Sequence, residues 1–257
     1  MKDFLSAIVI AFSFLTAIPL PMLEWKEQRI KFLPVLMPLV GLGIGSLGYC
    51  LFCLLDNFAF SVFSKAVIMA LFYPFITGGL HLDGLMDTAD AYFSRQSIEQ
   101  KLKIMKDSRV GAFAVITLIS LLLLKVAFFS ELFLAGRERA YLLLFIPVSS
   151  RIVQAVMLCS FPYAKEDGLA VMFGKNQRKG VIYTLSLFLA ITAGFIYLLD
   201  GFYSLLLPLG LILFTGFYYF FARKNFGGIT GDIVGAYVEL AELLLLGILV
   251  TILQIEV

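Results

Sequence analysis

Charged residues are scarce in this sequence. Only 15% of its 257 residues are Asp, Glu, Lys or Arg, whereas 61% are hydrophobic, and the mean hydropathy is +0.96. Soluble domains carry about 25% charged residues. The composition therefore excludes a soluble protein and indicates a polytopic protein of the lipid bilayer. The net charge of +2 is small and indicates no nucleic-acid partner.

Cysteine is rare as well. Cys50, Cys53 and Cys159 all lie in apolar segments. Cys50 and Cys53 form a C-x-x-C pair, but no second pair and no histidine follows at the spacing of a zinc site. We therefore interpret the three cysteines as small buried side chains, which indicate no particular redox compartment.

Apolar runs fill most of the chain and predict its fold. They cover approximately 4–21, 32–55, 58–80, 111–129, 138–160, 180–199, 201–221 and 232–253. Most are long enough to span a bilayer. The first ends in Pro19 and Pro21 without a convincing signal-peptide cleavage site, so we expect it to remain as a spanning or half-inserted segment. We predict an all-α membrane bundle of about seven or eight transmembrane helices, a single domain over 1–257 that can form an oligomer.

The distribution of Lys and Arg predicts the orientation. Fourteen of them fall in the segments 22–31, 81–110, 161–180 and 222–231, which share one side if all eight runs span, and three lie on the other side. By the positive-inside rule, the first side faces the cytoplasm. Both termini then lie outside, unless a half-inserted first segment returns the N-terminus to the inside. We expect a multi-pass protein of the cell (inner) membrane.

The longest polar interval runs from Gly78 to Gly111. In it Asp83, Asp87 and Asp90 recur at i, i+4 and i+7, which places three carboxylates on one face of a helix. A solvated face normally mixes charges of both signs, but no Lys or Arg lies between Leu80 and Ser94. We favour metal binding over a solvated or substrate-cation face, and carboxylate ligands indicate a hard ion such as Mg²⁺, Mn²⁺ or Ca²⁺.

The same interval holds the candidate catalytic residues. Asp107 is a further carboxylate that can fold back to the cluster, and Lys106 and Arg109 beside it are candidates for contacts to phosphate oxygens. His81 is the only histidine, and in a regular helix it points away from Asp83. It is a candidate general base or an interfacial hydrogen-bonding residue.

A second unusual segment, Phe226 to Glu242, lies on the same predicted side. Gly227, Gly228 and Gly231 precede a helix whose first turn holds Asp232, and such a turn can present amide groups to an anion. We therefore assign these glycines to substrate binding and Asp232 to the metal, against the alternative of a glycine hinge at a helix end.

Two charged residues lie deep in apolar runs. Glu239 stands seven residues after Asp232, and Arg151 lies in the middle of the run 138–160. Ionised groups in hydrocarbon cost a few kcal/mol and line cavities or form pairs. We predict that both contact substrate, with an acid of the second segment as the alternative partner of Arg151.

Three motifs in order carry a resemblance. They read GGLHLDGLMDTADA, KIMKDSRVGAF and FGGITGDIVGAYVELAE, and FLTAIPLP and LPVLMPLVGLGIG precede them. Over nearly its whole length the chain resembles cobalamin synthase, the adenosylcobinamide-GDP ribazoletransferase family. The family often has Gly after the third aspartate, where this chain has Ala91, a change between small residues.

The resemblance implies a membrane enzyme that uses Mg²⁺. It implies that adenosylcobinamide-GDP is joined to α-ribazole or its 5′-phosphate, giving adenosylcobalamin or its phosphate and releasing GMP. A secondary cation transporter is the alternative of another class, but it is expected to show two related halves, and the DGLMDTAD segment is not repeated. If one site binds both substrates, the turn at Gly227 to Asp232 must pack against the helix of Asp83.

Overall fold

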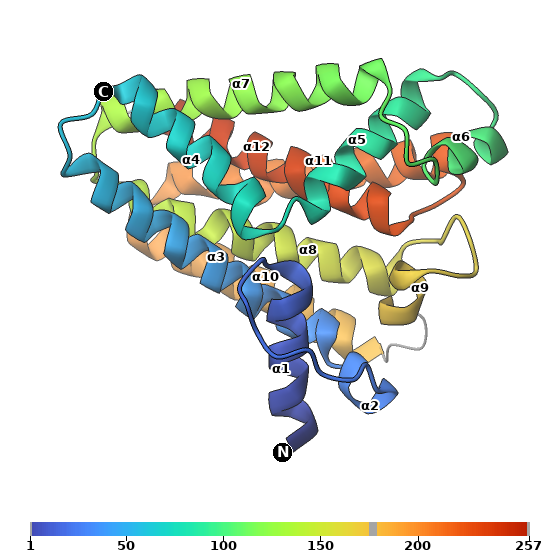
Figure 1. Cartoon of the computed structure of the whole chain (residues 1–257). Helices are drawn as coiled ribbons and strands as arrows, with labels where there is room; N and C mark the ends of the chain where they lie inside the picture. Colours follow the sequence, from blue (N-terminus) through green and yellow to red (C-terminus); the bar gives the residue numbers. More distant parts are fainter. Residues whose placement is uncertain (1, 175–178, 256–257) are drawn as a thin grey trace.

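The computed structural model describes residues 2–174 and 179–255, and this part of the chain contains no β-strand. Its elements follow in order in Figure 1: α1 (Lys2–Leu15), α2 (Glu27–Ile30), α3 (Leu33–Asp56), α4 (Val62–Ile76), α5 (Leu80–Phe93), α6 (Ile98–Ile104), α7 (Ala112–Ala135), η1 (Ala140–Leu144), α8 (Phe145–Ser160), α9 (Leu169–Gly174), α10 (Lys179–Asp200), η2 (Phe202–Leu205), α11 (Leu206–Phe226) and α12 (Gly231–Ile255). The predicted all-α fold is confirmed. Lys175 and Arg178, which contributed to the charge count, lie outside the described residues.

Among the described residues, six helices are long and apolar enough to cross a membrane. They are α3, α7, α8 with η1, α10, α11 with η2, and α12. Helices α4 and α5 pass the same test only together, and they are bent by 92° at the break between them. Because α4 and α5 both pack against α7, the pair follows one spanning helix along its length. The described residues thus contain six candidate spans, or seven with the bent pair, so the lower of the two predicted numbers is confirmed and an eighth span is not found among them.

The missing span is the first apolar run. Helix α1 has 14 residues, about 21 Å at 1.5 Å per residue, which is shorter than the ~30 Å of the hydrocarbon core. Asp3 pairs with Arg29, just before α3 (Nε to Oδ1, 3.2 Å). At the other end, the Ala17 amide donates to the Ile76 carbonyl at the α4–α5 break (2.7 Å). Of the two alternatives, the structure favours a half-inserted first segment, with the N-terminus at the end where α3 begins.

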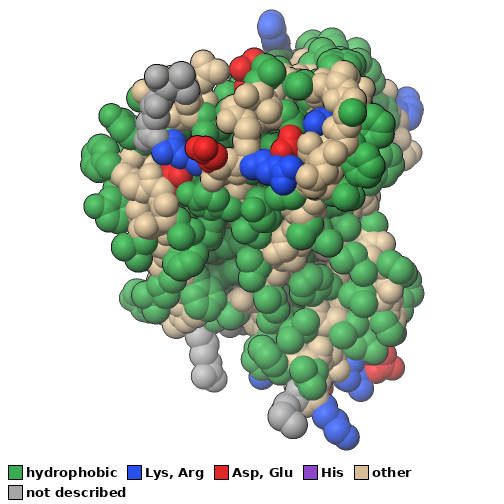
Figure 2. All heavy atoms as spheres, turned by 90° about the vertical axis from the view of Figure 1, so that its left-hand side faces the viewer, with side chains coloured by type: hydrophobic (Ala, Val, Ile, Leu, Met, Phe, Trp, Pro, Cys, Tyr) green, Lys and Arg blue, Asp and Glu red, His purple; other side chains and the backbone are tan. Residues whose placement is uncertain are grey.

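One end of the bundle is held by ion pairs between loops. Arg137, after α7, pairs with Asp56 at the end of α3, and Arg139 pairs with Asp200 at the end of α10 (3.0 Å). The Tyr141 hydroxyl also donates to Asp200 (2.8 Å). Figure 2 views this end and shows a few charged side chains grouped on a largely hydrophobic face. The acidic stretch lies at the opposite end of the bundle, where α6 and α9 are found in Figure 1.

Helix α12 lies at the centre of the bundle. It packs against α5, α7, α8 and α11, and 72% of its most apolar window is buried, compared with 11% for α10. Helix α10 therefore presents most of its surface to lipid. The N-terminus of α12 lies beside α5. The second motif is therefore next to α5, the helix that carries the acidic residues.

The three cysteines are free thiols but are not all buried. Cys50 is exposed on the surface of α3, and Cys53 and Cys159 are half-buried. The prediction of three buried side chains is therefore wrong. An apolar position in a membrane helix can face lipid as well as the protein core, so hydropathy alone does not distinguish the two.

Candidate active site

The three aspartates of the acidic stretch lie on α5, which begins after a sharp break in the chain. Gly78 and Gly79 adopt left-handed backbone conformations (φ 62° and 72°), which are strained for residues with a side chain. The Gly79 carbonyl then accepts a hydrogen bond from the Asp83 amide (2.8 Å). Asp83 is exposed on α5, while Asp87 and Asp90 are half-buried. The break therefore places the acidic face at the polar end of the bundle.

The two motifs meet at Gly84. A Cβ atom at this position would lie 2.7 Å from the Asp232 carbonyl oxygen and 2.9 Å from its Cα, so only glycine allows this approach of α5 to α12. The expectation that the second motif packs against the Asp83 helix is confirmed. The negative charges of Asp83, Asp90 and Asp232 all act on the Asp87 carboxylate. The four carboxylates thus share one region although they come from two distant segments.

Asp90 makes contacts that the sequence did not reveal. Its Oδ2 atom accepts a hydrogen bond from the Gly111 amide (2.6 Å), and its Oδ1 atom accepts one from the Ala114 amide (2.8 Å). These amides lie at the start of α7, whose N-cap residue, Gly111, has no side chain to offer. Asp90, which belongs to α5, therefore caps the N-terminus of α7. Its negative charge also interacts favourably with the positive end of the α7 helix dipole.

The donor set of this region fits a hard cation. It consists of carboxylates, the ligands that Mg²⁺ uses in proteins. Among the residues that the structure describes, no three His, Cys, Asp or Glu side chains are already grouped as a metal site. The predicted ligands are Asp83, Asp87, Asp90 and Asp232, of which Asp90 already accepts two amide hydrogen bonds. Metal binding at these positions stays a prediction.

The basic residues after α6 lie in an exposed loop. Arg109 donates to Asp107 (Nη2 to Oδ2, 2.6 Å; Nε to Oδ1, 3.0 Å), and this pairing lowers the pKa of the Asp107 carboxyl to about 2. Asp107 is therefore ionised at neutral pH and orients Arg109. Lys106 is exposed next to this pair. Their predicted catalytic roles stay predictions.

Lys165 is a cation near the site that sequence reasoning treated only as a topology signal. Burial and the positive charge of Lys106 lower its pKa, while the charges of Asp167 and Asp232 oppose this shift. Its ammonium donates to the Leu102 carbonyl (3.2 Å). A positive charge thus lies between the loop of Lys106 and the N-terminus of α12.

The glycine-rich turn before α12 is paired with another loop. Gly227 ends α11 in a left-handed conformation (φ 79°), and a Cβ at Gly228 would overlap the Pro162 carbonyl. The Ile229 amide donates to that carbonyl (2.8 Å), and the Ala164 amide donates to the Ile229 carbonyl (2.9 Å). Gly228 therefore serves a close approach of two loops. Gly231 is exposed with open space at its Cα, and the anion-binding role of all three glycines stays a prediction.

Two adjoining cavities border α5. The larger, about 1170 Å³, lies between the α4–α5 break, Asp83 and the segment that follows α1, including Trp25. The smaller, about 100 Å³, is lined by His81, Gln154 and Asp232. His81 is 3% exposed and faces this smaller cavity, so it points away from Asp83 as its spacing predicts. Its role as general base stays a prediction.

A family model described as cobalamin-5-phosphate synthase matches residues 7–250. The chain belongs to the cobalamin-5-phosphate synthase family. It is thus a transferase of cobalamin biosynthesis, and the resemblance noted from the motifs is confirmed. No solved structure matches the chain significantly.

Three curated relatives of this family share the name adenosylcobinamide-GDP ribazoletransferase. The protein of Halalkalibacterium halodurans is 38% identical over 98% of this chain and 97% of its own length. That of Clostridium perfringens is 35% identical over 97% of this chain and its full length. That of Desulfitobacterium hafniense is 39% identical over 92% of this chain and 93% of its own length.

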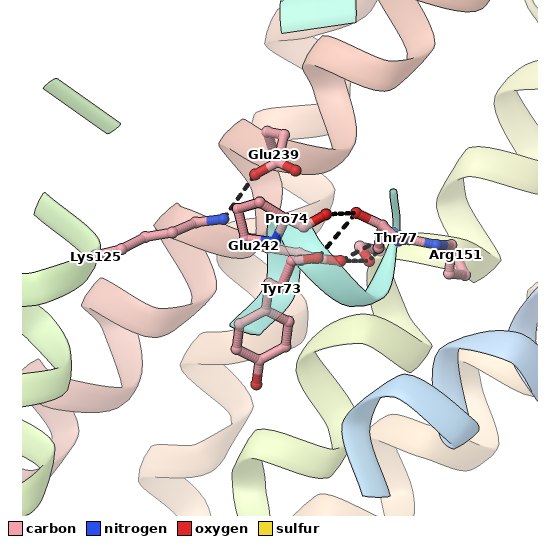
Figure 3. A network of polar contacts seen from close by, with 8 residues as sticks. Tyr73, Pro74, Thr77, Lys125, Arg151, Glu239 and Glu242 are labelled. Carbon is pink, nitrogen blue, oxygen red and sulfur yellow. Dashed lines mark hydrogen bonds and ion pairs between the residues drawn. The ribbon is translucent and has the colours of Figure 1, made fainter. Parts of the chain in front are cut away.

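Deeper in the bundle, this family member carries two buried ion pairs on α12, which Figure 3 shows side by side. Glu239 pairs with Lys125 of α7 (2.6 Å), and Glu242 pairs with Arg151 of α8 (2.9 Å). The Ser150 hydroxyl also donates to Glu242 (2.8 Å). Of the partners considered for Arg151, the structure shows the acid. Both Arg151 and Glu239 thus have protein partners. Their predicted contacts with substrate stay predictions.

Lys125 is the residue of this network that sequence reasoning missed. Its ammonium is buried and lies 6.0 Å from the ring centre of Tyr73, on the side of α4. The available signal was a lysine inside an apolar run, together with unpaired acids in the last run. An ion pair between two membrane helices holds these helices together. These two pairs therefore hold α12 against α7 and α8.

Proposed function

We propose that this member of the cobalamin-5-phosphate synthase family joins adenosylcobinamide-GDP to α-ribazole or its 5′-phosphate. The products are adenosylcobalamin or its 5′-phosphate, and GMP. The observation that carries the proposal is the contact at Gly84, where the N-terminus of α12 brings Asp232 to the helix of Asp83 and Asp87. Asp83 borders the cavity of about 1170 Å³. The names of the curated relatives support the substrates.

The reaction is a phosphoryl transfer. The acceptor hydroxyl oxygen forms a bond to the cobinamide-side phosphorus, the bond from that phosphorus to the GMP oxygen breaks, and the hydroxyl proton passes to a base. A carboxylate of Asp87 or Asp232 is suited to accept this proton because it lies in the same acidic region, and His81 is the alternative. Asp83, Asp87 and Asp232 would also hold Mg²⁺, which when bound neutralises charge on the pyrophosphate oxygens.

Cations around the acidic region complete the proposed site. A pyrophosphate brought next to several carboxylates requires positive charge on its other oxygens. Lys106 and Arg109 in the loop after α6 and Lys165 after α8 lie on this side of the bundle. We assign them to the phosphate groups, with Asp107 orienting Arg109. By the count of basic residues, this side of the bundle faces the cytoplasm. GMP is then released into the cytoplasm.

A reconstituted reaction tests this proposal. Purified protein with adenosylcobinamide-GDP, α-ribazole and Mg²⁺ is expected to form GMP and a corrinoid product in equal amounts, and removal of Mg²⁺ with a chelator is expected to stop turnover. Asp83→Asn is expected to lower kcat by roughly 10³-fold or more, because a ligand and a charge are lost. Glu166→Gln, at an exposed position outside the proposed site, is the matched control. Normal turnover by Asp83→Asn with unchanged Mg²⁺ dependence would refute the assignment.

A further inference from the structure

The smaller cavity carries an inference beyond the transfer itself. It has a volume of about 100 Å³ and is lined by residues of α1, α3, α5, α8, α9 and the first turn of α12. Phe14 and Leu80 line both this cavity and the larger one, so the two adjoin. Asp83 borders the larger cavity and Asp232 the smaller. The acidic region therefore lies where the two cavities come together.

Two buried polar atoms in this cavity have no hydrogen-bond partner. They are Nε2 of His81 and Oε1 of Gln154, on side chains that are 3% and 5% exposed. Buried polar atoms are normally paired, and an unpaired one is costly. The neighbouring Arg151 does not satisfy them: its Nη1 atom donates to Glu242 and Ser150, and its Nε atom has no partner either. Neither atom therefore has a partner among the residues that the structure describes.

The rest of the lining indicates what kind of partner fits. Phe14, Leu158, Phe173 and Val234 make most of the wall apolar, and no Lys or Arg is among the described residues that line it. The described lining is therefore unsuited to a phosphate group, and Asp232 adds negative charge to it. A volume of about 100 Å³ corresponds to roughly three waters at ≈30 Å³ each. It is too small for a corrinoid, and of the parts of the proposed substrates the flat aromatic base is the one that matches its size and apolar wall.

We propose that this cavity binds the aromatic base of the acceptor nucleoside, an inference that rests on the proposed function. The base lies among the apolar side chains, and its unsubstituted ring nitrogen accepts a hydrogen bond from Nε2 of His81, while Oε1 of Gln154 accepts one from a ribose hydroxyl. The ribose then extends toward Asp232, which brings its hydroxyl to the acidic region. The corrinoid and its pyrophosphate occupy the larger cavity beside Asp83. His81 is in this arrangement a recognition residue, and a carboxylate is the base of the reaction.

Substitution of Gln154 tests the proposal. Gln154→Leu keeps the size of the side chain but removes its polar atoms. We expect the KM for α-ribazole to rise by roughly 10-fold, the loss of about one hydrogen bond, while the KM for adenosylcobinamide-GDP stays unchanged. The affinity of the purified protein for α-ribazole, measured by calorimetry without corrinoid or Mg²⁺, is expected to fall by the same factor. Gln254→Leu, at the exposed far end of α12, is the matched control and is expected to leave both quantities unchanged.

A second variant removes space instead of polarity. Ala170 of α9 lines the cavity and is 5% exposed. Ala170→Leu is expected to raise the KM for α-ribazole by more than 10-fold, again without an effect on the corrinoid substrate. Unchanged values for α-ribazole in both variants would overturn the proposal and indicate a cavity filled by ordered water. A rise in the KM for adenosylcobinamide-GDP would equally overturn it. Absence of turnover in the unmodified protein would instead refute the proposed function, and α-ribazole binding by calorimetry would then decide the cavity's role.

Discussion

Substitution of Gly84 by alanine tests how closely α5 and α12 must approach. The added Cβ would lie 2.7 Å from the Asp232 carbonyl oxygen, whereas ordinary contact begins at 3.4 Å. The helices must therefore separate by roughly 0.7 Å. The opposing atoms belong to the backbone of α12, so rotation of a side chain cannot relieve the overlap. A displacement of about 1 Å at a reacting centre can cost 10²-fold in rate.

We expect Gly84→Ala to lower kcat by between roughly 10-fold and 100-fold, because Asp232 moves away from Asp83 and Asp87. Overpacking of this kind also costs about 1–3 kcal/mol of stability, which a thermal unfolding assay in detergent would detect. Gly84→Val is expected to lose more, since its branched side chain has further atoms at the same contact.

The assay measures product formation with both substrates at saturating Mg²⁺, together with the amount of folded protein. Gly194→Ala on α10 is the matched control, because a Cβ at Gly194 meets nothing within 4 Å. It is expected to keep full activity. Full activity of Gly84→Ala would refute the reasoning, since it would show that the separation of α5 and α12 does not set the geometry of the site.

Three further predictions concern the surrounding side chains. Lys125→Leu leaves Glu239 buried and unpaired and is expected to cost about 3–5 kcal/mol of stability; the double variant with Glu239→Leu is expected to recover most of it, and unfolding in detergent measures both. Asp90→Ala removes the cap of α7 and is expected to cost about 1–2 kcal/mol; if stability stays normal and only Mg²⁺ dependence changes, Asp90 acts as a ligand instead. Because Arg109 lowers the pKa of Asp107 to about 2, Asp107 stays ionised above its ordinary pKa near 4 and loses its charge only as the pH falls toward 2. The pH–rate profile between pH 5 and 8 is therefore expected to be the same for Asp107→Asn and the unmodified protein, and a lost acidic limb in the variant would contradict this.

The sequence by itself determined the environment and the general architecture. Hydropathy and helix length are local properties, so the runs that became α3, α7, α8, α10, α11 and α12 could be recognised as spans. The spacing of Asp83, Asp87 and Asp90 likewise showed one acidic helix face. The run 58–80 was one exception, because α4 passes as a span only together with α5, and the first run was another, because its 14-residue helix is too short to span. Its folding back depends on the contact of Ala17 with Ile76, which no local pattern shows.

Only the tertiary structure decided which distant residues meet. The contact of Gly84 with Asp232, the capping of α7 by Asp90 and the pairing of Lys125 with Glu239 join positions on different helices. Lys125 and Glu239 are 114 residues apart in the chain, and an ion pair at that separation depends on the rotation and tilt of two packed helices. Helical periodicity fixes which residues share a face of one helix, but the packing of side chains against neighbouring helices decides which face is presented to which partner.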